Sequence, residues 1–290
     1  EDYSFIGIDY QAYATPVNYQ LSESLGAKRI YVQFKDAGGS ESGIAVATIE
    51  YKSPDQLDGL IEQDQTLTVV VSPYKVTADL EIKTGVVLTI EPGVIVQIGS
   101  KDIVIKVKGK MVAEGSQALP IEFTSVNATG DSWQKPLIDF EGNDSSLSYC
   151  QFNGLLQIRG QGNVNQVTHC SFDSKTSQDD HGSLQEIEFK CNQIRYNTFE
   201  GVVAKFEMIS GSSFVYSENT HNGGKVEIDP GHESGTAVEV TNNQMANAPL
   251  RVNNRSNTPI LIADNQIESD SNGLYKEIGL DIDGHEQNVQ

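Results

Sequence analysis

One short phrase recurs at a nearly constant interval through the second half of the chain. Each copy has an apolar residue, two variable residues, a Cys or Asn, one further residue and usually a second apolar residue. The fourth position is held in turn by Cys150, Cys170, Asn197, Asn219, Asn243 and Asn265, at steps of 20, 27, 22, 24 and 22 residues. A period of this length predicts a solenoid, in which each copy contributes one turn that stacks on the previous turn.

The residues around these phrases predict strands and turns rather than helices. Val, Ile, Phe and Tyr cluster in short runs that Gly, Asn, Asp and Ser interrupt, and no long helical periodicity occurs. An Asn at the fourth position can adopt the left-handed conformation of a sharp turn, and its amide can bond to the Asn of the turns above and below. We therefore interpret the six fourth-position residues as a structural ladder.

The formal charge of −20 limits the expected partners of the chain. Nucleic acid requires a basic surface, so no nucleic-acid partner is expected, and the same charge disfavours an anionic membrane. No apolar run approaches the about 20 residues of a membrane helix, so membrane insertion is not expected. The acidity is typical of solubility in a salty or extracellular medium, and calcium binding through carboxylate oxygens is the alternative. The chain begins at Glu1 without Met, which predicts a mature product or a fragment, either a monomer or a segment of a larger surface protein.

The three cysteines form no metal-binding motif. Cys150 and Cys170 hold the same phase of neighbouring turns, and the spacing of about 4.8 Å between stacked strands lies within the range of disulfide Cα separations. A bridge between them is therefore one alternative. Two buried free thiols are favoured, because the Cβ vectors of in-register residues run parallel. Cys191 is expected in the core or in a turn.

Residues 1–51 have a different pattern from the rest of the chain. Alternating runs predict strands at 17–21, 29–34 and 44–51. Residues 27–42, which place Arg-Ile-Tyr-Val-Gln-Phe-Lys-Asp before a Gly turn, resemble the last two strands of Ig-like repeats in bacterial surface proteins. A complete sandwich of that kind needs about 100 residues, so we expect a partial Ig-like or capping β segment over 1–51. The polar residues 52–66 are expected to form a linker.

Three phrases in the next segment carry a second resemblance. They are Leu-Thr-Ile-Glu-Pro-Gly-Val at 88–94, Gly-Lys-Met-Val-Ala-Glu-Gly at 109–115 and Pro-Ile-Glu-Phe-Thr-Ser at 120–125. Together they resemble the opening turns of secreted bacterial right-handed parallel β-helix proteins, the pectin-lyase-like superfamily, over about residues 67–284. The resemblance implies an all-β chain with a right-handed parallel β-helix over 67–290. It does not specify an activity, because one fold carries many functions.

Between successive phrases lies another strand, and the side-chain period of two separates its inward and outward residues. Aligning these strands by their apolar residues predicts two outward columns of side chains. One column contains Gln157, Glu188, Lys205, Glu227, Arg251 and Asp281, whose charge alternates from Glu188 onward. The other contains Arg159, Lys190, Glu207, Asp229, Asn253 and Asp283. Alternating neighbours attract one another, so the first column predicts a ladder of cross-strand ion pairs.

Polysaccharide-active members of the superfamily use such an outward sheet as a substrate groove, and the resemblance implies candidate catalytic residues there. These are Lys205, Glu207, Glu227, Asp229 and Arg251, with Glu207 and Asp229 as candidate calcium ligands. A Lys or Arg would remove a proton next to a metal-neutralised uronate, or two carboxylates would act as acid and base. The alternative is a solvated charged face with no chemistry, which the sequence favours.

A protruding loop is predicted within the 27-residue step, and it contains the candidate binding residues Asp179, Asp180 and His181. The pattern of a polysaccharide hydrolase is incomplete there, so a polar surface loop is the simpler interpretation. The sequence therefore favours a secreted or cell-surface β-helix module that binds a polysaccharide or cell-surface glycan, or serves as a structural segment of an adhesin. A lyase or hydrolase acting on an acidic polysaccharide is the alternative function.

Overall fold

The computed structural model describes residues 9–125, 136–154, 156–173, 185–230, 237–253, 258–268 and 279–281, and these residues contain strands and turns but no helix. In this described part no segment therefore forms a helix able to cross a membrane. The chain divides into two units, Glu1–Pro54 and Asp55–Gln290. The first unit contains an antiparallel pair, β1 (Gly26–Val32) and β2 (Ala45–Tyr51). The strand expected at 17–21 is irregular chain instead.

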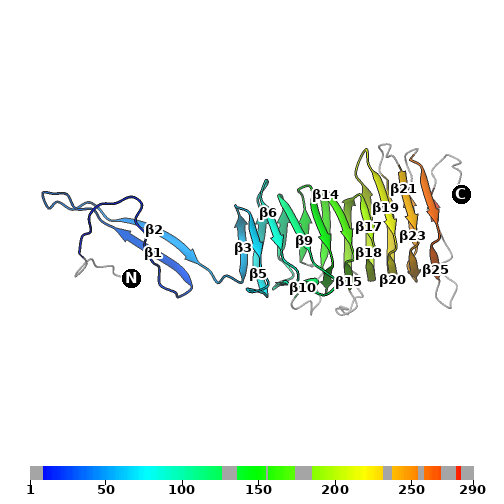
Figure 1. Ribbon diagram of the computed structural model, residues 1–290, viewed down its shortest axis with the longest axis horizontal. Helices are drawn as coiled ribbons and strands as arrows, with labels where there is room; N and C mark the ends of the chain where they lie inside the picture. The colour runs from blue at the N-terminus through cyan, green and yellow to red at the C-terminus, as the bar shows by residue number, and fades with distance from the viewer. Residues whose placement is uncertain are drawn as a thin grey trace. The chain divides into compact units, whose positions relative to one another are not determined.

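The second unit is a parallel β-solenoid, and its strands lie side by side in Figure 1 from cyan to orange. Each turn contributes strands to three faces. Face 1 consists of the first residues of β3 (Gln56–Ile61) and β5 (Tyr74–Ile82), then β7 (Ile95–Ile98), β10 (Ile121–Ser125), β13 (Cys150–Asn153), β15 (Ser171–Asp173), the first residues of β18 (Thr198–Met208) and β20 (Thr220–Asp229), β22 (Gln244–Ala246) and β25 (Gln266–Glu268).

The other two faces are built in the same way. Face 2 consists of the later residues of β3, β5, β18 and β20 together with β8 (Val104–Val107), β11 (Leu137–Phe140), the first residues of β14 (Gln157–Thr168), β16 (Gln185–Cys191), β23 (Leu250–Asn253) and β26 (Gly279–Asp281). Face 3 consists of β4 (Gln65–Leu67), β6 (Val87–Ile90), β9 (Lys110–Glu114), β12 (Ser145–Ser148), the last residues of β14, β17 (Gln193–Arg195), β19 (Ser213–Ser217), β21 (Ala237–Thr241) and β24 (Ile260–Ala263).

The first turn begins earlier than the sequence predicted. The segment 52–66 was expected to be a linker, but it contains β3 and most of β4, which pair in parallel with β5 and β6. Their apolar side chains Leu57, Ile61 and Leu67 are buried. The polar residues between them lie on the outside of the coil, which is why the segment has the composition of a linker.

Side chains alternate between the inside and the outside along each strand, so every second residue places an apolar side chain in the interior of the solenoid. On face 1 this produces a stack of parallel rings, Phe123, Phe152, Phe172 and Phe199, whose centroids are 4.9, 4.9 and 5.0 Å apart. His221 continues the stack at 4.1 Å from Phe199. Its Nε2 shares a hydrogen bond with the hydroxyl of Tyr216, and both side chains are buried.

The predicted ladder lies at the corner between faces 3 and 1 and is confirmed as a chain of buried amides. Asn197, Asn219 and Asn243 each donate from Nδ2 to Oδ1 of the next Asn, the last being Asn265, at 3.1, 3.0 and 2.8 Å. At the early end, the Cys170 N–H donates to Asn197 Oδ1 at 2.8 Å. All three thiols are free and buried.

The left-handed residue of each corner is not the Asn itself, as the sequence had suggested, but the residue before it. Positive φ angles of 48° to 59° occur at Tyr149, His169, Tyr196, Glu218, Asn242 and Asp264. This preceding residue turns the chain, so the side chain that follows points into the core and can join the ladder.

Candidate functional site

Face 2 carries the charged residues that the sequence singled out. Lys205 and Glu207 lie on β18, Glu227 and Asp229 lie on β20, and Arg251 lies on β23. The backbone register places Lys205 opposite Glu227 and Glu227 opposite Arg251, and it places Glu207 opposite Asp229. The structure therefore brings all five residues onto adjacent strands, as the sequence predicted.

The two ends of the predicted column are displaced by two residues. Gln157 lies opposite Glu186, and it is Arg159 that lies opposite Glu188. At the other end, Asp281 lies opposite Asn253 and not Arg251. A slip of two residues keeps every side chain on its own face, so the alternation of apolar residues could not reveal it.

The corrected register extends the column by three turns towards the N-terminus. Its successive members are Glu81, Lys106, Asp139, Arg159, Glu188, Lys205, Glu227 and Arg251. Charge alternates without exception through these eight positions. The first three residues were missed because the early turns were recognised by their phrases and were not aligned with the later ones.

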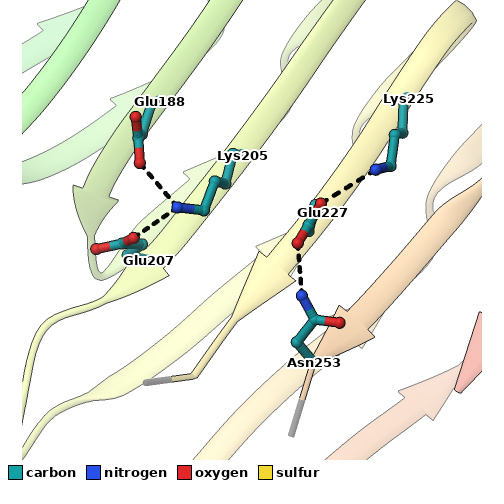
Figure 2. Close-up of polar contacts among 6 residues, drawn as sticks. All are labelled: Glu188, Lys205, Glu207, Lys225, Glu227 and Asn253. Atoms are coloured by element: carbon teal, nitrogen blue, oxygen red, sulfur yellow. Dashed lines mark hydrogen bonds and ion pairs between the residues drawn. The ribbon is translucent and has the colours of Figure 1, made fainter. Parts of the chain in front are cut away.

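Lys205 is held between two carboxylates. Its Nζ lies 2.8 Å from Glu207 Oε1 on the same strand and 2.9 Å from Glu188 Oε1 on the neighbouring strand (Figure 2). The hydrogen bonds to Glu207 and then to Glu188 raise the pKa of Lys205 above its ordinary value. A proton-abstracting lysine needs a lowered pKa, so this environment has the wrong sign for a general base at neutral pH.

Glu227 also has one polar partner on its own strand and one on the neighbouring strand. Lys225 Nζ lies 3.1 Å from Oε2, and Asn253 Nδ2 donates to Oε1 at 2.5 Å (Figure 2). Partial burial alone would raise the pKa of Glu227, but the hydrogen bond and charge of Lys225, the bond from Asn253 and the charge of Arg251 outweigh it and lower the pKa. A glycosidase acid needs a raised pKa, so Glu227 is suited to remain a carboxylate.

The Asp139–Arg159 pair, on β11 and β14, contains the most buried charged side chain of the column. The Asp139 side chain is 2% exposed, and it accepts hydrogen bonds from Arg159 Nε at 3.3 Å and Nη2 at 2.5 Å. A bidentate contact of this kind fixes both side chains and compensates the buried charge. It ties two neighbouring turns together.

The calcium prediction for Glu207 and Asp229 is not tested directly. The two carboxylates lie on adjacent strands, but Glu207 already contacts Lys205. Among the described residues no group of three or more His, Cys, Asp or Glu side chains is placed to hold a metal ion. Asp179, Asp180 and His181 lie outside the described residues, so the predicted binding loop stays a prediction.

Two hollows of the described surface lie away from the charged column. One, of about 550 Å³, lies beside the corner that joins faces 2 and 3 and is lined by Lys108, Lys110 and Asp144 among others. The other, of about 470 Å³, belongs to the N-terminal unit and is lined by Tyr10 and Phe34 among others. Neither hollow includes the five candidate catalytic residues.

Comparison of the chain with protein-family models, with curated proteins and with solved structures found no match. The fold assignment therefore rests on the strand register and the corner ladder, and the functional assignment rests on the chemistry of the faces.

Proposed function

We propose that the chain is a structural segment of an extracellular, cell-surface protein, of the kind found in adhesins. The observation that carries this proposal is the alternating column of face 2. Lys205 is paired with Glu188 and Glu207, Glu227 is paired with Lys225, and the pKa shifts of Lys205 and Glu227 favour their charged forms. Such a face stabilises a rod, whereas a lyase or hydrolase needs an unengaged base or acid directed at substrate.

The continuous interior of the solenoid supports the same proposal. A parallel sheet that continues from turn to turn, with an amide ladder along one corner, makes each turn depend on its neighbours. A segment of this kind holds other modules at a fixed separation without any reactive group. The net charge of −20 is also in keeping with an extracellular setting.

Two experiments test the proposal and separate it from the enzymatic alternative. Antibodies against the chain, applied to intact and to permeabilised source cells, should label the intact cells. Incubation of the full chain with polygalacturonate, pectin and alginate, with and without calcium, should produce neither unsaturated products absorbing in the near ultraviolet nor new reducing ends. Labelling only after permeabilisation, or turnover that Lys205→Met abolishes, would contradict it.

A further inference from the structure

The outward side of face 1 has the opposite character from face 2. One in-register column of its side chains is uncharged over six successive turns: Gln151, Ser171, Thr198, Thr220, Gln244 and Gln266. In a chain with 40 acidic and 20 basic residues, an uninterrupted row of amides and hydroxyls is a distinct surface.

The polar groups of this column are available to a ligand. The first three residues are half-buried and the last three are exposed. Within the described part of the chain none of the six side chains makes a hydrogen bond, whereas the charged groups of face 2 are bonded to one another. Amides and hydroxyls both donate and accept hydrogen bonds, so each turn presents a donor and an acceptor along the same strip of the outer surface.

A second column flanks the first on the same face. It contains Asn153, Asp173, Glu200, Asn222, Ala246 and Glu268 in matching register. Its carboxylates can accept hydrogen bonds from hydroxyl groups and would repel an anionic polymer. The two columns together therefore favour a ligand that is rich in hydroxyl groups and carries no negative charge.

Stacked aromatic rings border the early part of the uncharged column. Tyr149, His169 and Tyr196 precede Gln151, Ser171 and Thr198 by two residues, and their ring centroids are 4.5 and 4.8 Å apart. These bulky residues adopt positive φ angles, a conformation that Asn or Asp occupies at lower cost at the later corners. His169 and Tyr196 are exposed and Tyr149 is half-buried, and backbone strain at aromatic residues of the surface points to a role beyond folding.

We propose that the uncharged column of face 1 binds an extended, uncharged β-1,4-linked polysaccharide that runs along the solenoid axis with one sugar residue per turn. Stacked strands are about 4.8 Å apart, which is close to the advance per sugar residue in such an extended polymer. The six positions span about 24 Å on this spacing. This site goes beyond the structural role proposed above and does not depend on it.

The test uses the full chain and uncharged oligosaccharides of defined length. Calorimetric titration with β-1,4-linked oligomers of glucose and of xylose should show affinity that rises with length and levels off near six residues. Thr198→Glu/Thr220→Glu places two charges in the middle of the column and should weaken binding at least tenfold. Gln161→Glu/Asn165→Glu adds the same charge at exposed positions of β14 outside face 1 and should bind like the unaltered chain.

Far-ultraviolet circular dichroism and the melting temperature establish that each variant is folded. If Thr198→Glu/Thr220→Glu does not fold, Gln244→Ala/Gln266→Ala replaces it under the same criterion. The proposal is overturned if no uncharged oligomer binds, if only polygalacturonate or alginate binds, or if the face 1 variants bind as well as the control. Self-association of the unliganded chain that these variants abolish would also overturn it, since a second copy would then occupy the face.

Discussion

Asn219→Ala tests how much the corner ladder contributes to the stability of the solenoid. In the native structure Asn219 Oδ1 accepts from the backbone N–H and the side-chain Nδ2 of Asn197, at 3.0 and 3.1 Å. Its Nδ2 donates to Ile194 O at 2.9 Å and to Asn243 Oδ1 at 3.0 Å. The substitution removes all four bonds inside a corner where both neighbouring Asn side chains are buried.

The expected loss follows from the groups that remain without partners. The Asn197 backbone N–H and one N–H of its Nδ2 lose their acceptor, and Ile194 O loses a donor. A buried group left without its partner costs about 1–3 kcal/mol, so we expect Asn219→Ala to lower the free energy of unfolding by about 3–5 kcal/mol. Asn243 Oδ1 contributes little to this loss, because it keeps the bond from the Asn219 N–H at 3.0 Å.

Urea unfolding followed by far-ultraviolet circular dichroism measures the effect as a shift of the midpoint at unchanged slope. Asn222→Ala is the matched control, because Asn222 lies on β20, which begins directly after Asn219, is only half-buried and has no side-chain hydrogen bond in the described part of the chain. It should change the free energy of unfolding by less than about 0.5 kcal/mol. A loss below about 1 kcal/mol for Asn219→Ala, or equal losses in the two variants, would refute the assignment of the ladder as a stabilising element.

Three further predictions concern titration, charge and thiol access. Burial lowers the pKa of His221 to about 3 from an ordinary 6.5, so the unfolded chain binds this proton first as the pH falls. The free energy of unfolding should therefore decrease from about pH 6.5 towards pH 3, by about 3 kcal/mol at pH 4. Urea unfolding of His221→Phe at each pH should lack this part of the pH dependence. Lys205→Glu should lower the free energy of unfolding by about 1–2 kcal/mol at low salt and by less at 1 M salt, because it places like charges beside one another; equal losses at both salt concentrations would contradict an electrostatic column. Burial raises the pKa of Cys150, so this thiol should react with a disulfide reagent only at the rate of unfolding, and rapid labelling of the native chain would contradict the buried corner.

Much of the architecture is encoded locally and was accessible from the sequence. The interval of the Cys/Asn phrase specifies one turn per copy, and the apolar alternation specifies which side chains face the interior. The neighbouring charges of Lys205, Glu227 and Arg251 follow from those two periods alone, and the register confirms them. The secreted location, the Ig-like resemblance and the glycan partner stay predictions, because they depend on more than strand periodicity.

The remaining part of the candidate site depended on the tertiary structure. Alternation has a period of two, so it is blind to a slip of two residues, and only the stacked strands show that Arg159 and not Gln157 lies opposite Glu188. The partners of Lys205 and Glu227 also combine residues from the same strand and from neighbouring strands, which no single column predicts. The uncharged column of face 1 occupies the position after each Cys or Asn of the repeated phrase, so its alignment is already present in the sequence. Only the tertiary structure shows that these side chains lie on the outside of the coil and make no hydrogen bond within the described residues.

The sequence by itself determined that the chain coils into a parallel β-solenoid, because the repeat interval and the apolar alternation are both set by the order of residues along the chain. The tertiary structure decided which polar groups bond to one another and which stay available to a ligand. That division depends on register and on corner geometry, where the left-handed residue before each ladder position sets the phase of the next strand. Lys205 and Glu227 of face 2 are paired with neighbouring side chains, whereas the six side chains of the uncharged column of face 1 make no hydrogen bond within the described residues, although both faces follow the same repeat.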